Sequence, residues 1–171
     1  MKNKPLLFIL LAAVTLLSQF RAVDAQENWY NYRPRTLKQL LEQVAKVASE
    51  SEGRKAHLEL LFTDSFPSRV TVTYTGEKRA IPAKRKEFIG YWAKSRGLRQ
   101  EIVDLFEDEL LFKEDSTEYW LPVQKQVIPF FAEELKKGDT VELYLIITGS
   151  RTEEGVADWV FLVNEFKKWP A

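Results

Sequence analysis

The stretch that decides the fold is VELYLIITGSRTEEGVADWVFLV, residues 141–163. Two runs in it carry an apolar side chain at every second position, the period of a β-strand: Val141, Leu143, Leu145 and Ile147, then Trp159, Phe161 and Val163. The positions between them are apolar as well: Tyr144, Ile146, Val160 and Leu162. A strand that is apolar on both sides is a central strand, covered above and below. The pattern therefore predicts a central hairpin with a loop over residues 150–157.

The rest of the sheet is predicted from shorter runs of the same alternation, at residues 58–62, 70–74, 78–81, 101–106, 110–114 and 118–121. Turn residues at 64–68 join the first two runs into a strand pair, and residues 75–77 supply a second turn. We expect Pro82 and Pro122 to end the strands that precede them. A helix over residues 98–111 is the alternative for part of this segment, because its apolar residues also fit a helical spacing.

Three helices are expected, at residues 36–51, 83–96 and within 123–136. The first has one apolar face, made by Leu37, Leu40, Leu41, Val44, Val47 and Ala48. Thr36 and Gln39 form a capping-box pattern at its start. The second should bury Phe88, Ile89, Trp92 and Ala93, with Gly97 just past its end. Pro129 belongs in the first turn of the third helix, because a proline disrupts a helix interior.

These elements predict an α+β fold. We expect a curved antiparallel sheet or a partly open small barrel with about three helices, and the N-terminal amphipathic helix packed on it. Residues 75–97 and 115–138 are weakly similar at a shift of 40 residues, which is compatible with an internal duplication. Any two strand–helix units resemble each other this much, so a chance similarity is the alternative.

The first 25 residues have the pattern of a secretory signal peptide. Lys2 and Lys4 supply a positive start, residues 6–17 are apolar but for one Thr, and residues 23–25 form a cleavage site. About 12 apolar residues reach only about 18 Å as a helix, short of a membrane core of roughly 30 Å. We therefore expect cleavage after Ala25, an extracytoplasmic location (periplasmic or secreted), and no stable membrane span after cleavage.

The mature chain is predicted to be one domain. Residues 26–35 carry Trp29, Tyr30 and Tyr32 without any period, and we interpret them as an extended aromatic arm. Residues 36–171 form a single globular α+β domain. Seven Gly and seven Pro are too few for a layout of several domains joined by linkers.

The composition excludes several classes of protein. The chain has 171 residues, 25 basic and 25 acidic side chains, one His and no Cys. The absence of Cys excludes disulfides, thiolate metal sites and a Cys nucleophile, and a single His removes most zinc, copper and haem sites, so no cofactor is expected. Without residues 1–25 the chain keeps 22 basic and 24 acidic residues, so it lacks the positive charge that nucleic-acid binding needs.

The sequence contains none of the common catalytic motifs, such as G-x-S-x-G or H-E-x-x-H. His57 lies in an alternating run and is expected to be an edge or solvent-facing strand residue. Whether the protein is an enzyme stays open, because the acids between residues 104 and 118 could supply the paired carboxylates of glycoside hydrolysis. A solvated acidic rim, or weak Ca²⁺ binding, is the alternative role for these acids.

Charge is segregated along the domain. Between Lys78 and Arg99 eight residues are basic and one is acidic, whereas between Glu101 and Glu118 eight are acidic and one is basic. One interpretation is that the two blocks pair with each other. The other is an exposed basic patch that binds an unknown protein or an anionic envelope component. The candidate ligand contacts in this patch are Lys84, Arg85 and Lys86.

Tyr119 and Trp120 are the candidate aromatic ligand contacts. Neighbours on a strand point to opposite faces, so one of the two leaves the main core unless both faces are covered. An exposed Tyr or Trp suits a sugar or peptide ligand, and core packing is the alternative. We therefore expect an exported, non-enzymatic binding or interaction domain. The alternatives are a small cofactor-independent hydrolase with paired carboxylates and a carrier of an apolar ligand.

Overall fold

The computed structural model describes residues 31–51, 60–62, 66–153 and 156–169. Its elements are β1 (Arg33–Pro34), α2 (Leu37–Ser51), β2 (Leu60–Phe62), β3 (Pro67–Ala80), α3 (Ala83–Ser95), α4 (Gln100–Val103), β4 (Phe106–Glu114), β5 (Thr117–Gln124), α5 (Ile128–Glu134), β6 (Thr140–Glu153) and β7 (Val156–Lys168). The predicted signal peptide, residues 26–30 of the aromatic arm and His57 lie outside the described residues. Across these described ranges, no helix combines the length and the apolar character that a membrane crossing requires.

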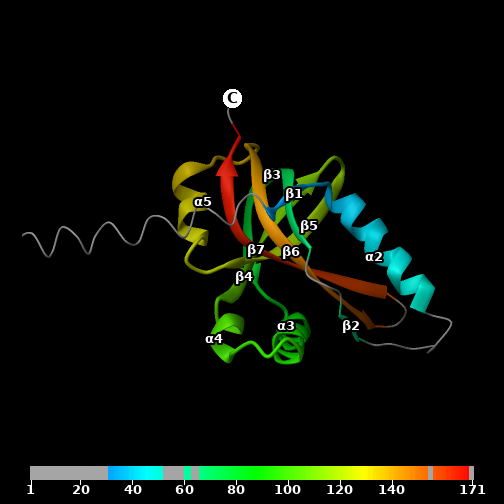
Figure 1. The fold of residues 1–171 in the computed structure, drawn as a ribbon. Coiled ribbons are helices and arrows are strands. Elements are labelled where there is room, and N and C mark those ends of the chain that lie inside the picture. Colours follow the sequence, from blue (N-terminus) through cyan, green and yellow to red (C-terminus); the bar gives the residue numbers. More distant parts are fainter. Residues whose placement is uncertain (1–30, 52–59, 63–65, 154–155, 170–171) are drawn as a thin grey trace, which may run out of the picture. The chain divides into compact units, whose positions relative to one another are not determined.

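The seven strands of the described chain form one mixed sheet in the order β1-β3-β4-β5-β7-β6-β2 (Figure 1). A further pairing joins β3 to β6, so β3, β4, β5, β7 and β6 follow one another in a ring-like arrangement. The ring is least extensively paired between β5 and β7, where the strands are parallel and only Val123 and Val163 are in register. The predicted α+β class is confirmed. The sheet is partly ring-like, but it does not form the barrel that we considered as an alternative.

The predicted central hairpin is confirmed and is longer than expected. β6 pairs with β7 on one side and with β3 and β2 on the other, and Leu145 at its middle is fully buried. The loop predicted over residues 150–157 is wrong, because the β6–β7 register continues to the pair Glu153 and Val156. Polar residues suggested a loop there. The hydrogen bonds of a strand ladder use only the backbone, so a ladder tolerates such residues.

β3 is a single strand of 14 residues. Two strands, at residues 70–74 and 78–81, were expected here with a turn at residues 75–77. This prediction is wrong, because the chain continues through the expected turn as one strand. The register of β3 on β4 shifts between Tyr74 and Lys78, so these residues form a bulge. Gly76 has a φ of +80° in the bulge, a conformation that favours glycine. A bulge and a turn thus need the same residue types, but a bulge keeps the chain in the sheet.

In the described part of the predicted strand pair 58–62 and 70–74, residues 60–62 do not pair with residues 70–74. β2 and β3 each pair with β6 instead, because the sheet curves so that segments distant in sequence meet. The two segments of the weak internal similarity differ at their prolines. Pro82 is the N-cap residue of α3, whereas its counterpart Pro122 lies inside β5.

The segment around residue 100 also differs from the prediction. Residues 101–106, expected to be a strand, contain most of the short helix α4, and β4 begins only at Phe106. The alternative helix over residues 98–111 is correct for that one turn alone. Pro122 does not end β5 and is paired in register with Glu109. A proline fits a strand at a position where the ladder does not need its missing N–H.

All three predicted helices are present, and α4 is the fourth helix of the described chain. The capping box of α2 is formed: the Gln39 N–H donates to Thr36 Oγ1 and the Thr36 N–H donates to Gln39 Oε1, both at 3.0 Å. Pro129 lies in the first turn of α5. α3 buries the four residues expected to face inward, Phe88, Ile89, Trp92 and Ala93.

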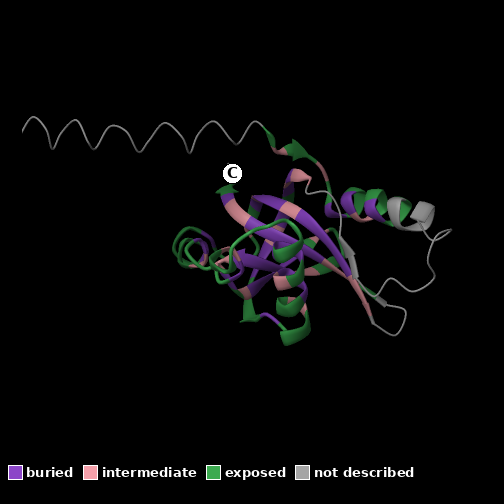
Figure 2. Ribbon diagram, turned by 60° about the horizontal axis from the view of Figure 1, so that its bottom comes forward, coloured by how far each residue is buried: buried purple, intermediate pink, exposed green. Residues whose placement is uncertain are grey.

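The core occupies both faces of the β6–β7 hairpin, and exposed residues lie on the outer sides of the helices, on the turns and at strand ends (Figure 2). On one face, Leu145 and Phe161 belong to a large cluster that includes side chains of α2 and α5. On the other face, Val160 and Leu162 belong to a second cluster with side chains of α3 and α4. The second cluster holds α3 against β7, and this contact positions the candidate site.

Candidate binding site

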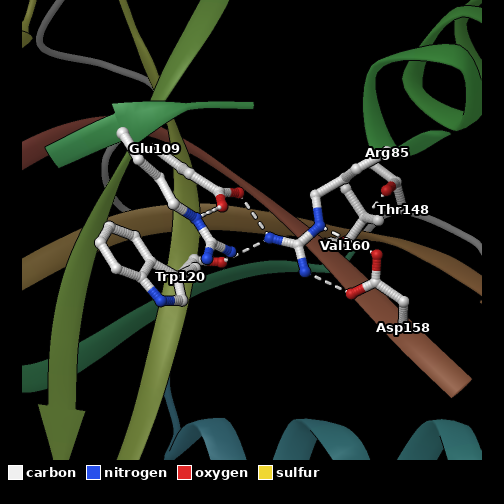
Figure 3. Close-up of polar contacts among 7 residues, drawn as sticks. Arg85, Glu109, Trp120, Thr148, Asp158 and Val160 are labelled. Carbon is white, nitrogen blue, oxygen red and sulfur yellow. Dashed lines mark hydrogen bonds and ion pairs between the residues drawn. The ribbon is translucent and has the colours of Figure 1, made fainter. Parts of the chain in front are cut away.

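Arg85, in the first turn of α3, connects three strands (Figure 3). Its Nη1 donates to Glu109 Oε2 of β4 at 2.5 Å and to the Trp120 carbonyl of β5 at 3.1 Å. Its Nε donates to Asp158 Oδ2 of β7 at 3.0 Å, and its Nη2 donates to the other oxygen of that carboxylate. Burial lowers the pKa of Arg85, but the hydrogen bonds and charges of Asp158 and then Glu109 outweigh this effect and raise it.

Glu109 is the buried centre of this network. Its side chain has no exposed surface, and its two oxygens accept hydrogen bonds from Arg85 and from Arg79 Nε, each at 2.5 Å. The Arg79 guanidinium also lies over the indole of Trp120, with its Cζ 4.1 Å from the ring centre. Arg79, Glu109, Arg85 and Asp158 therefore form a chain of alternating charges. Such pairing is what a buried charge requires.

A cavity of about 240 Å³ lies beside the network. Its charged groups come from Arg85, Glu118 and Asp158. Its walls are mostly apolar and come from α2, β5 and β7: Leu41, Tyr119, Trp120, Leu121, Trp159 and Phe161. Residues from four separate elements thus line one small space.

The charges around the cavity balance one another. Asp158 is paired with Arg85, and Glu118 accepts from Lys113 Nζ at 2.9 Å. The side chains of Asp158 and Glu118 are 42% and 54% exposed, so their oxygens remain within reach of a ligand. Burial, and then the nearby charge of Glu114, raises the pKa of the Tyr119 hydroxyl, so this group keeps its proton and can donate. The site offers aromatic residues and carboxylate acceptors whose charges are paired.

The structure brings three of the five sequence-predicted contacts together. Arg85, Tyr119 and Trp120 all line the cavity. Lys84 and Lys86 are exposed on α3 and do not line it. Only 13% of the Arg85 side chain is exposed, so the three basic residues do not form one common surface patch.

The two blocks of opposite charge pair with each other at three cations. Lys78 bonds Asp108 at 3.2 Å, and Arg79 and Arg85 both bond Glu109. The interpretation in which the blocks pair is therefore confirmed for these cations. Ligand binding by Lys84 and Lys86 stays a prediction.

Sequence reasoning missed the contributions of Leu41, Glu109, Asp158 and Trp159. Leu41 was assigned to the core face of its helix, and Glu109 to a solvated acidic rim. The adjacent residues Asp158 and Trp159 could have indicated the site, because a charged side chain and an indole occur next to each other there. The sequence did not predict this role, because residues 150–157 were expected to be a loop. Asp158 then had no expected partner on a neighbouring strand, whereas in the structure it pairs with Arg151.

The arrangement does not favour paired-carboxylate hydrolysis. The two carboxylates that line the cavity, Asp158 and Glu118, are each paired with a cation, Arg85 or Lys113, and Glu109 is bonded to Arg85 and Arg79. A glycoside hydrolase needs an acid with a raised pKa, which a cation partner opposes. Within the described residues, no group of three His, Cys, Asp or Glu side chains is placed to hold a metal ion.

Comparison with known proteins gives no relative from which a function could be transferred. The chain matches no family model, and no curated protein or solved structure matches it.

Proposed function

We propose that the protein is an exported, non-enzymatic binding domain that holds one neutral, hydroxyl-rich ring, such as a sugar unit, in the cavity beside Arg85. The observation that carries the proposal is that three aromatic residues and a fully paired set of charges line one small space. The walls include Tyr119, Trp120 and Trp159. Aromatic faces pack well against the apolar face of a ring.

The charge balance supports a neutral ligand over an ionic one. An ionic ligand would have to compete with Arg85 for Asp158, or with Lys113 for Glu118. Hydroxyl groups avoid this competition, because they can donate to the free lone pairs of a carboxylate that is already paired.

Size and rigidity support a single ring. Sites for drug-sized ligands usually measure about 300 to 1,000 Å³, and this cavity is smaller, at about 240 Å³. Arg79 covers one face of Trp120, and the Trp120 carbonyl is bonded to Arg85. These contacts hold the indole in place before a ligand arrives, which lowers the entropy lost on binding.

Binding should depend on the charge of the ligand and on Trp159, one of the two tryptophans that line the cavity. We expect methyl glucoside to bind better than glucuronate or glucosamine, which keep the ring but add a negative or a positive charge. Trp159→Ala should weaken binding by about tenfold or more, a loss of about 1.4 kcal/mol. Titration calorimetry, or NMR shifts of the indole N–H groups, measures this difference.

Trp169→Ala is the matched control. Trp169 is 47% exposed and does not line the cavity, so its loss should leave sugar binding unchanged. Equal affinity for the neutral and charged sugars, or equal losses in the two variants, would contradict the proposal. No binding of any neutral methyl glycoside by a folded parent protein would also reject it.

The exported location rests on residues 1–25 and has its own test. We expect the extracytoplasmic fraction to contain a chain that begins at Gln26, because cleavage follows Ala25. Replacing Leu10 with Arg interrupts the apolar run and should leave Met1 in place and the protein inside the cell. N-terminal sequencing of both forms decides, and Met1 retained in extracytoplasmic parent protein is the result that rejects the cleavage site.

A further inference from the structure

A second cavity, of about 440 Å³, lies between α3 and α4 and shares no lining residue with the first. Gly90, Ala93 and Val103 are among its lining residues, and Val103 and Ala93 are buried. Tyr91, Lys94 and Leu98 also line it, and all three are exposed. Figure 1 shows α3 and α4 together at one end of the sheet, away from α5. We call this space the α3–α4 groove.

The packing of the described residues does not explain why position 90 is a glycine. It lies in the middle of α3, where glycine costs about 1 kcal/mol relative to alanine. Its φ is not in the positive range, and a Cβ added there would meet no atom within 4 Å. Neither the backbone nor a neighbour therefore requires glycine. The remaining physical use of glycine is to let a group from outside the chain approach the helix backbone closely.

The rim of the groove exposes large apolar side chains. Tyr91 and Leu98 are 47% and 40% exposed. Within the described residues, four large hydrophobic side chains are exposed in this way, and two of them flank the groove. Apolar side chains gathered at a hollow are typical of an interaction site.

The charge around the groove favours an acidic partner. The exposed cations of the α3–α4 segment are Lys84, Lys86, Lys94, Arg96 and Arg99. The exposed acids of the same segment are Glu87, Glu101 and Asp104. Glu87 lines the groove and accepts from Tyr91 at 2.9 Å, and Asp104 accepts from Gln100 at 3.0 Å. These neutral donors leave both carboxylates charged, so the exposed side chains of the segment keep an excess of two positive charges, five against three.

We propose that the α3–α4 groove docks an acidic peptide segment of a partner protein, which inserts one apolar side chain over Gly90. The hollow fits an inserted side chain, and the surrounding cations fit carboxylates on either side of it. A bilayer would use the exposed cations and Leu98 but not the depth of the groove, so a peptide is favoured over a membrane surface. The site is independent of the sugar cavity, since no residue lines both.

The test uses the mature chain and a library of labelled peptides with one apolar residue flanked on both sides by Glu or Asp. We expect selected peptides to bind with an affinity that falls as salt rises, because the flanking contacts are exposed charges. Gly90→Leu fills the space and should reduce the affinity at least tenfold. Lys94→Glu should do the same, whereas Lys167→Glu on β7 is exposed, lies away from the groove residues and should have no effect.

Folding of the variants is checked by circular dichroism and by the unfolding temperature. Gly90→Ala should raise the unfolding temperature, because alanine is the better helix former and its Cβ meets no atom. If Gly90→Leu does not fold, the pair Gly90→Ala and Leu98→Ser replaces it, and both should weaken binding. Binding unchanged by these substitutions, peptides with Lys in place of the acids binding equally well, or binding of anionic vesicles without peptide binding would overturn the proposal.

Discussion

Arg85→Met is expected to lower the free energy of unfolding by about 3 kcal/mol, which is about 6 to 12 °C in unfolding temperature for a chain of this size. The substitution keeps most of the apolar stem and removes the guanidinium. Glu109, which has no exposed surface, is then left with Arg79 alone. Removing one partner of a buried pair costs about 3 to 5 kcal/mol, and the remaining Arg79 places the expected loss at the lower end. Urea denaturation measures it.

The neighbouring lysine provides the control for this prediction. Lys86 lies one residue away on the same helix and is exposed, so Lys86→Met should change the free energy of unfolding by no more than about 0.5 kcal/mol. Arg85→Lys should fall between the two, because an ammonium keeps the charge but cannot bond both carboxylates with a planar fork. If Arg85→Met and Lys86→Met are equally stable, the network does not stabilise the fold.

Leu145→Ala should lower the free energy of unfolding by about 2 to 5 kcal/mol, because it opens a cavity in a strand that has neighbours on both sides. Leu145 is fully buried in the larger core cluster and is paired in register with Val163 and Ser68. The surrounding strands cannot collapse into the space without breaking their registers. Thermal and urea unfolding of the purified variant provide the measurement.

Ile146→Ala tests whether the effect depends on the face of the strand. Ile146 is the next residue along β6, points to the opposite face and is only partly buried beside the smaller cluster. Its substitution should therefore cost less than that of Leu145. A larger loss for Ile146→Ala would show that the smaller cluster, which holds α3, contributes more to stability than the larger one.

Local periodicity was sufficient to predict the elements on which these experiments rest. The alternation along residues 141–147 and 159–163 identified two strands with apolar side chains on both faces, and both faces are covered. The helical spacing of Phe88, Ile89 and Trp92 identified the buried face of α3. These predictions were correct because a repeat of two or of 3.6 residues fixes which face of an element a side chain occupies.

Predictions that required a turn to be told apart from a bulge were less successful. Residues 75–77 contain the glycine that either structure needs, and the choice depended on β4, which lies about thirty residues later and continues the ladder past the bulge. Residues 150–153 looked like a loop for a related reason. Their side chains are polar, but β7 supplies the backbone partners that keep them in a strand.

What the sequence determined by itself is the face that each side chain occupies: Arg85 at the start of a basic helix, Tyr119 and Trp120 on opposite sides of a strand, and the apolar run of the first 25 residues. The convergence of Arg85, Tyr119 and Trp120 on one site was decided by the tertiary structure. Arg85 meets Glu109 across 24 residues and Asp158 across 73. The physical reason is that periodicity describes one element at a time, whereas the partner of a charge depends on strand order and register between distant segments. Only the pairing of β4 with β5 and of β5 with β7 brings the carboxylates of Glu109 and Asp158 and the Trp120 carbonyl to the same guanidinium (Figure 3).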